Sequence, residues 1–523
     1  MCLFPIISTV ARLARVAEKS SRQPHKEKSI HRRNFVFIHR SRIIARCVPQ
    51  NIGMENVERI LGEFATPNNV VTHEFKCGKL SGAVIVNPDL SDASVPRAVI
   101  YALENCAQKL DSLDDFDRYA LLEYDIKISS DVQDCINKLL NGDMLLCVDG
   151  DARYAVINAR SYTTRAIMEP PTETVMRGPR EGFIEDLKTN LSLLERRLKT
   201  PDLAIDRMEI GRRTKTNVAV CYLNSVAAPQ VVQKIKSRLK KIDIDGIVDS
   251  HYLVPYLEEK PYSVFTQTGI SEKPDVVAAK LLEGRVALVV DGSPMVLTVP
   301  FVLIEEFQSG EDYYQRAPYS TFVRILRYLG LILATLLPAL YVAMQNFHYT
   351  LIPVRFMITL MTAIKGLPLS PLAETLFVLL LFEIIREASV RMPRAVGMAM
   401  SIVGALVLGE TAVNAGIISS PAVMITALSS IALFTVPNLI GPMSILRLAF
   451  TLIGGLCGLF GLILAVLFAL HYVCSLNAYD SPYLAPFAPL VYSDFKDAIE
   501  RGPLTTMKKR PKSIPNQNPT RQI

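Results

Sequence analysis

The residues of this sequence that could most clearly do chemistry are ionisable side chains inside otherwise apolar segments. Glu383 and Arg386 lie three residues apart, which places them on one face of a helix. Glu410 and Asn414 are separated by about one helical turn, and Glu374 has no opposite charge within a helical turn. An ionised group inside a membrane span costs about 2.5–3.5 kcal/mol, so such residues usually face a partner or an aqueous cavity.

Two interpretations of these charges follow from their spacing. In the first, Glu383 and Arg386 form an internal ion pair at the cytosolic or interfacial end of a span. In the second, carboxylates from several copies form a ring in an oligomer, because acidic rings favour cation pores. Glu410 and Asn414 present a similar choice, between a polar conduit and contacts among the helices of one chain. The sequence leaves both choices open.

The surrounding composition predicts a membrane domain over residues 321–475. Half of the 523 residues are hydrophobic, and the mean hydropathy is +0.25. A helix needs about 20 apolar residues to cross a bilayer. Apolar stretches occupy residues 328–344, 371–388, 395–419, 421–436 and 448–470. We therefore predict a polytopic α-helical membrane domain with four or five spans, most simply four.

Basic residues near the ends of these stretches set the expected topology. Lys and Arg collect on the cytosolic side of membrane spans. Here they precede the first stretch, at Arg324 and Arg327, and recur in the tail, residues 476–523. We therefore expect the N-terminal half and the tail to be cytosolic. Residues 351–366 are too short and basic for a comfortable span, which is typical of an interfacial or re-entrant helix.

Three glycines lie on the last predicted span. Gly454, Gly458 and Gly461 follow one another at i, i+4 and i+7. Small residues at this spacing let a second helix approach closely. The expected partner is either another helix of the same chain or a second copy of it.

Charge is unevenly distributed along the chain. The net charge is +7, but residues 1–50 alone contribute +9 and residues 501–523 contribute +6, which leaves −8 for the body between them. Two basic arms around a mildly acidic body argue against a general nucleic-acid-binding surface. The arm at 1–50 has no repeating pattern, and we expect it to be disordered.

Motifs for catalysis, cofactors and metals are missing from the sequence. The nine cysteines include no C-x-x-C pair, and the seven histidines include no H-E-x-x-H motif. A phosphate-binding P-loop, a dinucleotide-binding glycine motif and a nucleophile elbow are missing as well. We therefore expect a protein that is not an enzyme and that holds no cofactor or structural metal.

Residues 51–320 mix helical and strand-like periodicity, which is typical of an α/β or α+β domain. The pattern KLLxG…LxVDG begins at Lys138 and again, 142 residues later, at Lys280. Each copy predicts a helix end with a glycine C-cap, a strand, a two-residue Asp-Gly turn and a return strand. The repeat predicts two related cytosolic subdomains, at about 51–165 and 201–320.

A linker, residues 166–200, joins the two predicted subdomains. Apolar residues recur with helical spacing from Glu181 to Lys199, which predicts an amphipathic helix whose charged face includes Glu195. Basic residues at the start of a helix are unfavourable without an anionic partner. The start of this helix is therefore a candidate coupling or interface site. Its residues are Arg177, Gly178, Arg180, Glu181, Gly182 and Phe183.

Four segments together resemble the A subunits of bacterial spore germinant receptors, a family that includes the A-type protein of the spore dipicolinate-release operon. The resemblance extends over roughly residues 51–495. The segments are EPPTETVMRGPREGFIEDLKTNLSLLERRLKTPDL (169–203), DYYQRAPYSTFVRILRYL (312–329), LFEIIREASVRMPRAVGMAMSIVGALVLGETAVNAGIISSPAVMITALSSIA (381–432) and SPYLAPFAP (481–489).

The resemblance implies a multi-pass protein of the spore inner membrane with a large cytosolic N-terminal domain. It also implies partnership with a transporter-like B subunit and a lipoprotein C subunit, and assembly of several copies into an ion channel that opens on nutrient sensing. The alternatives are the related subunit of the dipicolinate-release machinery, a secondary transporter and a membrane-anchored scaffold. A transporter would show inverted repeats and broken helices over 322–473, which the sequence does not reveal.

Overall fold

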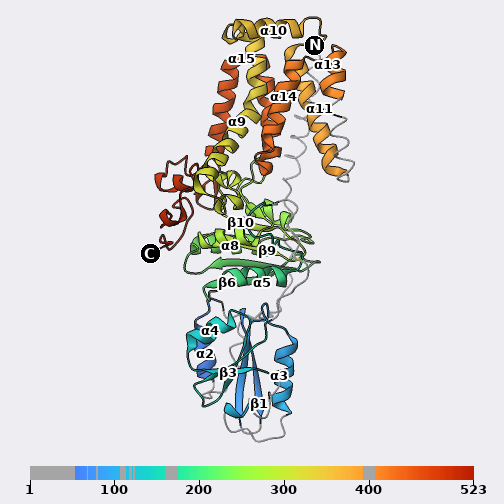
Figure 1. Cartoon of the computed structure of the whole chain (residues 1–523). Coiled ribbons are helices and arrows are strands. Elements are labelled where there is room, and N and C mark those ends of the chain that lie inside the picture. The colour runs from blue at the N-terminus through green and yellow to red at the C-terminus, as the bar shows by residue number, and fades with distance from the viewer. Residues whose placement is uncertain are drawn as a thin grey trace, which may run out of the picture. The chain divides into compact units, whose positions relative to one another are not determined.

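The computed structural model describes residues 54–66, 69–77, 80–105, 113–116, 121, 124–160, 173, 175–392, 404 and 407–522. The predicted arm (1–50), the start of the predicted linker and the first half of the predicted span at 395–419 lie outside these residues. Along the described chain, two sheet-containing subdomains are followed by a group of helices and a C-terminal tail (Figure 1).

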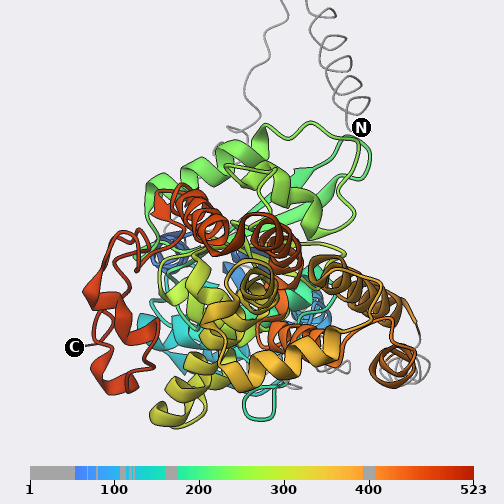
Figure 2. The ribbon, with the colours of Figure 1, turned by 90° about the horizontal axis from the view of Figure 1, so that it is seen from above.

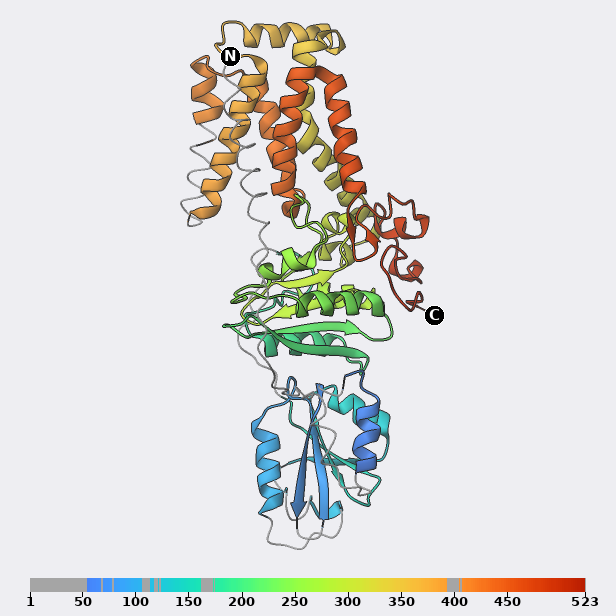
Figure 3. The same cartoon turned by 180° about the vertical axis from the view of Figure 1, so that it is seen from behind.

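The first subdomain is a five-stranded antiparallel sheet with the strand order β1-β2-β4-β5-β3. Figure 3 shows α3 on one side of this sheet and α2 and α4 on the other. Its elements are α2 (Met54–Gly62), β1 (Val71–Cys77), β2 (Leu80–Val86), α3 (Ser94–Glu104), β3 (Ile126–Ser129), α4 (Val132–Leu139), β4 (Met144–Val148) and β5 (Tyr154–Ile157).

The apolar strand β2 explains the two-sided core of this sheet. Val84 packs in the same cluster as Val99 of α3, whereas its neighbour Ile85 packs with Ile60 of α2 and Ile136 of α4. Successive side chains of a strand point to opposite faces. A strand that is apolar at consecutive positions is therefore buried on both sides.

The second subdomain repeats this arrangement, with the strand order β6-β7-β9-β10-β8. Because all paired strands in both sheets are antiparallel, the N-terminal domain is α+β rather than a parallel α/β fold. Its elements are α5 (Leu187–Arg197), β6 (Leu203–Ile210), β7 (Thr216–Leu223), α6 (Pro229–Lys240), α7 (Val254–Leu257), β8 (Gly269–Ser271), α8 (Pro274–Leu282), β9 (Val286–Val290) and β10 (Val296–Val299).

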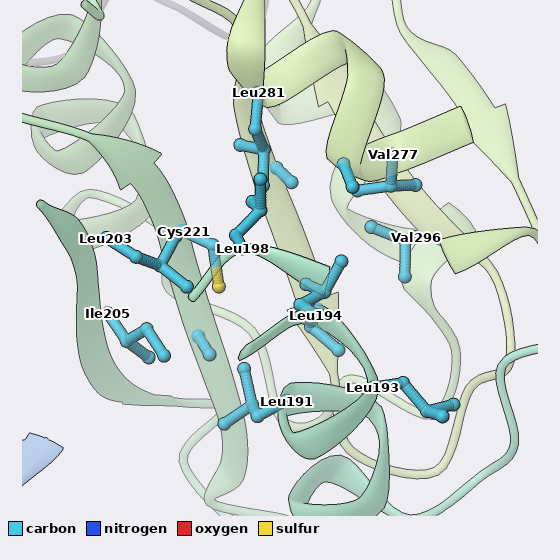
Figure 4. Packing of buried hydrophobic residues seen from close by; sticks show 14 of the residues in the cluster. Leu191, Leu193, Leu194, Leu198, Leu203, Ile205, Cys221, Val277, Leu281 and Val296 are labelled. Carbon is cyan, nitrogen blue, oxygen red and sulfur yellow. The ribbon is translucent and has the colours of Figure 1, made fainter. Parts of the chain in front are cut away.

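Helix α5, expected as a linker, occupies the place in the second subdomain that α2 has in the first, immediately before the first strand. Its leucines lie in the core of the second subdomain (Figure 4). Leu191 and Leu194 pack there with Cys221 of β7 and Leu281 of α8. The helix is therefore part of a folded subdomain and not a free connection.

The predicted start of this helix at Glu181 was wrong, because α5 begins at Leu187. Asp186 is the N-cap, and its carboxylate accepts the backbone N–H of Thr189 at 2.8 Å. Upstream, the side chain of Asn190 accepts the backbone N–H of Ile184 at 2.8 Å and so holds that residue outside the helix. The RGPREGF motif accordingly does not lie at a helix N-terminus.

The two Asp-Gly sites do not form the predicted two-residue turns. Five residues, 149–153 and 291–295, separate the paired strands in each subdomain. Gly150 and Gly292 have φ angles of 87° and 84°, which only glycine adopts without strain. In the second copy the loop contacts the residues just before α5, since the N–H of Gly292 donates to the carbonyl of Glu185 at 2.8 Å.

Two helices of the described chain are long and apolar enough to cross a membrane, judged by length and composition: α9 (Ala317–Phe347) and the segment Pro437–Cys474, which contains α15 (Ile440–Cys474). Figure 2 looks down this group of helices. The other helices are α10 (Val354–Ile364), α11 (Pro371–Arg391), α13 (Ala412–Asn414) and α14 (Ser420–Leu433).

The expectation of one continuous helix over 448–470 was wrong. Gly458 has φ 64° and ψ −159°, a conformation outside the helical region that only glycine tolerates. Leu446 and Ala469 pack in one cluster, although 23 residues of straight helix would separate them by about 35 Å. The two halves of α15 therefore fold back on each other at Gly458 (Figure 3).

The break gives the three glycines of α15 different surroundings. Gly454 lies against α9, where an added Cβ would stand 2.9 Å from the carbonyl oxygen of Ala339. Gly458 forms the turn. At Gly461 an added Cβ would stand 2.3 Å from the Cβ of Cys457, which lies in the half of α15 before the break. Close approach to α9 thus depends on Gly454, within one chain.

Glu195 of α5 was expected on a solvated face and is 5% exposed instead. The side chain of Asn87, which follows β2, donates to its carboxylate at 3.2 Å. Nearby, Asp89 of the first subdomain pairs with Arg207 of the second. Burial, reinforced by the charge of Asp89, raises the pKa of Glu195 to about 8. A carboxyl group that resists ionisation thus lies where the two subdomains touch.

This burial predicts a stability that falls as pH rises. Because the pKa of Glu195 is raised from 4.5 to about 8 on folding, the native state binds its proton more tightly, and stability is lost between those two pH values. We expect Glu195→Gln to raise the thermal unfolding midpoint at about pH 8 and to stabilise the fold there by roughly 1–3 kcal/mol, with little gain at about pH 5. Circular dichroism of the full chain measures this.

Glu209→Gln is the matched control, because Glu209 is an exposed glutamate near the C-terminal end of β6. It should shift the unfolding midpoint equally little at both pH values. If Glu195→Gln shifted the unfolding midpoint equally at both pH values, the raised pKa of Glu195 would be contradicted.

Candidate functional site

Arg447 of α15 is the centre of a polar network among three helices. Its side chain is 2% exposed, and its guanidinium donates to Glu383 of α11 at 2.7 Å. It also donates to the hydroxyls of Ser429 and Ser430 of α14, at 3.2 and 3.1 Å. Arg386 binds the second oxygen of Glu383 at 2.5 Å. One half-buried carboxylate therefore holds two guanidinium groups.

The pairing of Glu383 with Arg386, one of the two interpretations of their spacing, is thus present, whereas Arg447 was not predicted as a partner. The last predicted span began at Leu448, which left Arg447 as a flanking cation. A single arginine directly beside a long apolar stretch was the available signal. Its partner lies 64 residues away in the chain, so spacing alone offered no means of pairing the two.

The network continues to α9 through a proline. Pro338 lies inside α9 and has no N–H, which leaves the carbonyl of Ala334 without its helical donor. The hydroxyl of Ser429, which Arg447 also contacts, donates to that carbonyl at 2.7 Å. Glu383, Arg447 and Ser429 therefore connect α11, α15, α14 and α9 in one chain of hydrogen bonds.

Glu374 lies at the start of α11 and is fully buried. Its carboxylate accepts the backbone N–H of Ser419, the N-cap of α14, where the positive end of the helix dipole stabilises an anion. Among the described residues, the other carboxylate oxygen and both side-chain amide atoms of Gln345 on α9 are buried without a hydrogen-bond partner.

Glu410 and Asn414 lie apart from this buried polar group. Glu410 is in a π-helical turn, Val407–Thr411, and Asn414 ends the short helix α13. Both side chains are exposed. The side chains of Glu410 and Asn414 are therefore accessible from outside this group of helices.

A shallow, open hollow of about 490 Å³ lies along α11. Its lining includes Glu383 and Arg386, together with Glu387 and Arg391, whose side chains are 58% and 78% exposed and pair with each other at 2.6 Å. An exposed charged surface on a helix surrounded by apolar ones needs an aqueous or protein neighbour.

The RGPREGF motif lies against the second subdomain. Glu181 pairs with Arg197 of α5 at 2.5 Å, and the N–H of Phe183 donates to the carbonyl of Glu272 at 2.7 Å. Gly178 has φ 124°, and an added Cβ would stand 2.7 Å from the ring of Tyr314. Of the remaining motif residues, Gly182 is buried, whereas Arg177 and Arg180 are exposed.

A second buried ion-pair network lies at the start of α9. Arg324 is fully buried and donates to Asp312 and to Asp497 of the tail, both at 2.9 Å. Arg327 donates to the same Asp312 carboxylate at 2.8 and 3.0 Å. These arginines were predicted as flanking cytosolic charges. In the structure Arg324 joins α9 to the tail, whereas Arg327 joins it to the segment before α9.

The described residues contain no group of three or more His, Cys, Asp or Glu side chains placed to hold a metal ion.

Comparison with known proteins identifies the family. The family described as "Bacillus/Clostridium GerA spore germination protein" matches residues 58–513. This chain belongs to the GerA family. The match includes every candidate residue described above. Family membership and the two apolar helices together indicate that the chain associates with a membrane.

Individual relatives extend over most of this GerA-family chain. "Spore germination protein KA" of Bacillus subtilis is 34% identical over 488 residues, 90% of this chain and 88% of the relative. "Spore germination protein GerLA" of Bacillus cereus is 33% identical over 476 residues, 89% of this chain and 96% of the relative. "Uncharacterized membrane protein YfkQ" of B. subtilis is 40% identical over 375 residues, 71% of this chain and 73% of the relative.

One similar solved structure is the N-terminal domain of the A subunit of the Bacillus megaterium spore germinant receptor GerK3. It is 29% identical and covers 47% of this chain and 92% of its own, with a TM-score of 0.36.

The Arg447–Glu383 pair yields a stability prediction. Arg447→Met leaves Glu383 with one guanidinium in place of two, and breaking a buried pair costs about 3–5 kcal/mol. Because Arg386 stays in place, we expect a loss of roughly 2–4 kcal/mol. Replacing both partners, Arg447→Met with Glu383→Gln, should cost less than the sum of the two single changes. Unfolding of the purified full chain in detergent measures these losses.

Arg391→Met is the matched control, because Arg391 forms an exposed i,i+4 pair on the same helix as Glu383. It should cost at most about 0.5 kcal/mol. Equal losses for the two arginine variants would show that burial does not matter here.

Proposed function

We propose that this chain is the A subunit of a nutrient germinant receptor and that several copies assemble into an ion channel that opens during spore germination. Membership of the GerA family supports the role in germination. The assignment as an A subunit rests on the similarity to the GerK3 A subunit and to the spore germination proteins. We further propose that it works with a transporter-like B subunit and a lipoprotein C subunit.

The observation that carries the channel proposal is the group of charged side chains along the hollow on α11. Glu383, Arg386, Glu387 and Arg391 line it on a helix whose neighbours expose large apolar side chains. Charged groups of this kind are unfavourable in lipid. Contact with a second copy of the chain, around a water-filled path, satisfies them. The partly unpaired buried polar atoms of Glu374 and Gln345 also favour a site that water reaches.

Exposed apolar side chains support the proposed multi-pass arrangement. Only 22% of the most apolar 18-residue stretch in Pro437–Cys474 is buried, whereas the core helix of a soluble protein is mostly buried. Each half of α15 is about 25 Å long, close to the thickness of the hydrocarbon layer. We propose that α9 and both halves of α15 cross the spore inner membrane, with the N-terminal domain in the cytosol.

A secondary transporter is the second candidate, because the break in α15 at Gly458 resembles the discontinuous helices of transporters. The two functions differ in whether current requires a substrate. A channel conducts with ions alone, whereas a transporter carries current only when its substrate is present. The related role in dipicolinate release differs from both. It predicts that spores without this chain lose dipicolinate release while their cation release continues.

Conductance of the purified full chain in planar bilayers tests the channel proposal. We expect discrete, cation-selective openings, and we expect Glu374→Gln and Glu410→Gln to reduce cation selectivity at least several-fold, because each removes a negative charge from the proposed path. Glu500→Gln, an exposed carboxylate in the tail, is the control and should leave selectivity unchanged.

The same variants tested in spores relate the conductance to germination. Cation release that is unchanged in both variants, at normal protein levels, would remove Glu374 and Glu410 from the pore. Absence of any conductance from the assembled wild-type protein would overturn the channel proposal and leave germination signalling without conduction.

A further inference from the structure

The loop between α7 and β8 has an ordered shape that its hydrogen bonds explain. The carboxylate of Glu258 accepts the N–H of Gln267 at 2.6 Å and so closes the loop at its base. The side chain of Gln267 donates to the carbonyl of Lys260 at 3.2 Å. Ser263 donates its N–H to the same carbonyl at 2.9 Å. Pro261 and Tyr262 therefore form the tip of a cross-braced loop.

This loop is attached to the C-terminal end of α15. The ammonium group of Lys260 donates to the carbonyl and the hydroxyl of Ser475, at 3.1 and 2.9 Å, and lies over the ring of Tyr472. A cation at this position is favourable, because the C-terminus of a helix carries partial negative charge. Phe265 packs against Tyr472 and in one buried cluster with Val473.

The tip of the loop presents apolar surface beside the end of an apolar helix. Tyr262 is fully exposed, at 100%, and Val264 is 44% exposed. Close to the same ends of α15 and α14, Leu470 and Phe434 are also about half exposed. These four side chains provide apolar and amphipathic surface where the proposed spans end.

We propose that the tip of this loop, with Tyr262 at its apex, inserts into the headgroup layer of the membrane. This inference rests on the proposed insertion of α15. Tyrosine is enriched at membrane–water interfaces, where its ring meets apolar matter and its hydroxyl meets water. Lys260 has the usual position of a lysine whose stem lies along apolar surface near a helix end. The bracing of the loop lowers the entropy cost of placing the ring in lipid.

A fluorescence experiment tests this inference directly, because the chain contains no tryptophan. Tyr262→Trp introduces a single fluorophore at the tip, and Val264→Trp introduces one on the flank of the same loop. Each full-length variant is placed in phosphatidylcholine nanodiscs that carry a nitroxide either on the headgroup or deep in the acyl chain. We expect blue-shifted emission that the headgroup nitroxide quenches more strongly than the deep one.

Two further variants calibrate the measurement. Phe468→Trp, at a 73% exposed position on α15, should be quenched more strongly by the deep nitroxide. Tyr101→Trp, at a 70% exposed position in the first subdomain, should be quenched only by acrylamide in the water.

The outcomes separate the two proposals. Quenching of Phe468→Trp by lipid, with Tyr262→Trp and Val264→Trp reached only by acrylamide, would overturn the loop inference and leave the insertion of α15 intact. Shielding of the loop variants from both lipid and acrylamide would show a protein neighbour in place of lipid and would also overturn it. If neither nitroxide quenched Phe468→Trp, membrane insertion itself would be overturned, and the loop inference with it.

Discussion

The cost of removing charge from water governs the helical part of this protein. Arg447 is almost completely buried, and a guanidinium in such a place persists only when carboxylates and hydroxyls surround it. Glu383 and the hydroxyls of α14 meet that need, which fixes how α11, α14 and α15 are placed against one another. The carbonyl freed by Pro338 is satisfied by the same group of side chains.

The same principle operates where α9 leaves the second subdomain. Arg324 and Arg327 share the carboxylate of Asp312, and Arg324 also holds Asp497 of the tail. A movement of α9 would disturb these ion pairs and would therefore act on the tail and on the segment before α9. The structure thus provides a physical connection between the apolar helix α9, the segment before it and the tail.

Much of the N-terminal fold could be predicted from local pattern. The strands at 144–148 and 286–290 and the 142-residue repeat were evident, since alternating and continuous apolar runs depend on neighbours in sequence. The length of the Asp-Gly loops could not be predicted, because Gly292 donates to a backbone carbonyl more than 100 residues away. The start of α5 was misplaced for a similar reason, since Asn190 and Glu272 hold the preceding residues outside the helix.

By itself the sequence determined the family and the apolar character of the C-terminal part, and it offered the pairing of Glu383 with Arg386 as one of two interpretations, because each depends on composition or on residues a few positions apart. Only the tertiary structure decided that Glu383 also binds Arg447, that Glu374 caps α14 and that α15 folds back at Gly458. Those outcomes depend on which distant side chains share a low-dielectric interior. Sequence distance carries no information about that proximity.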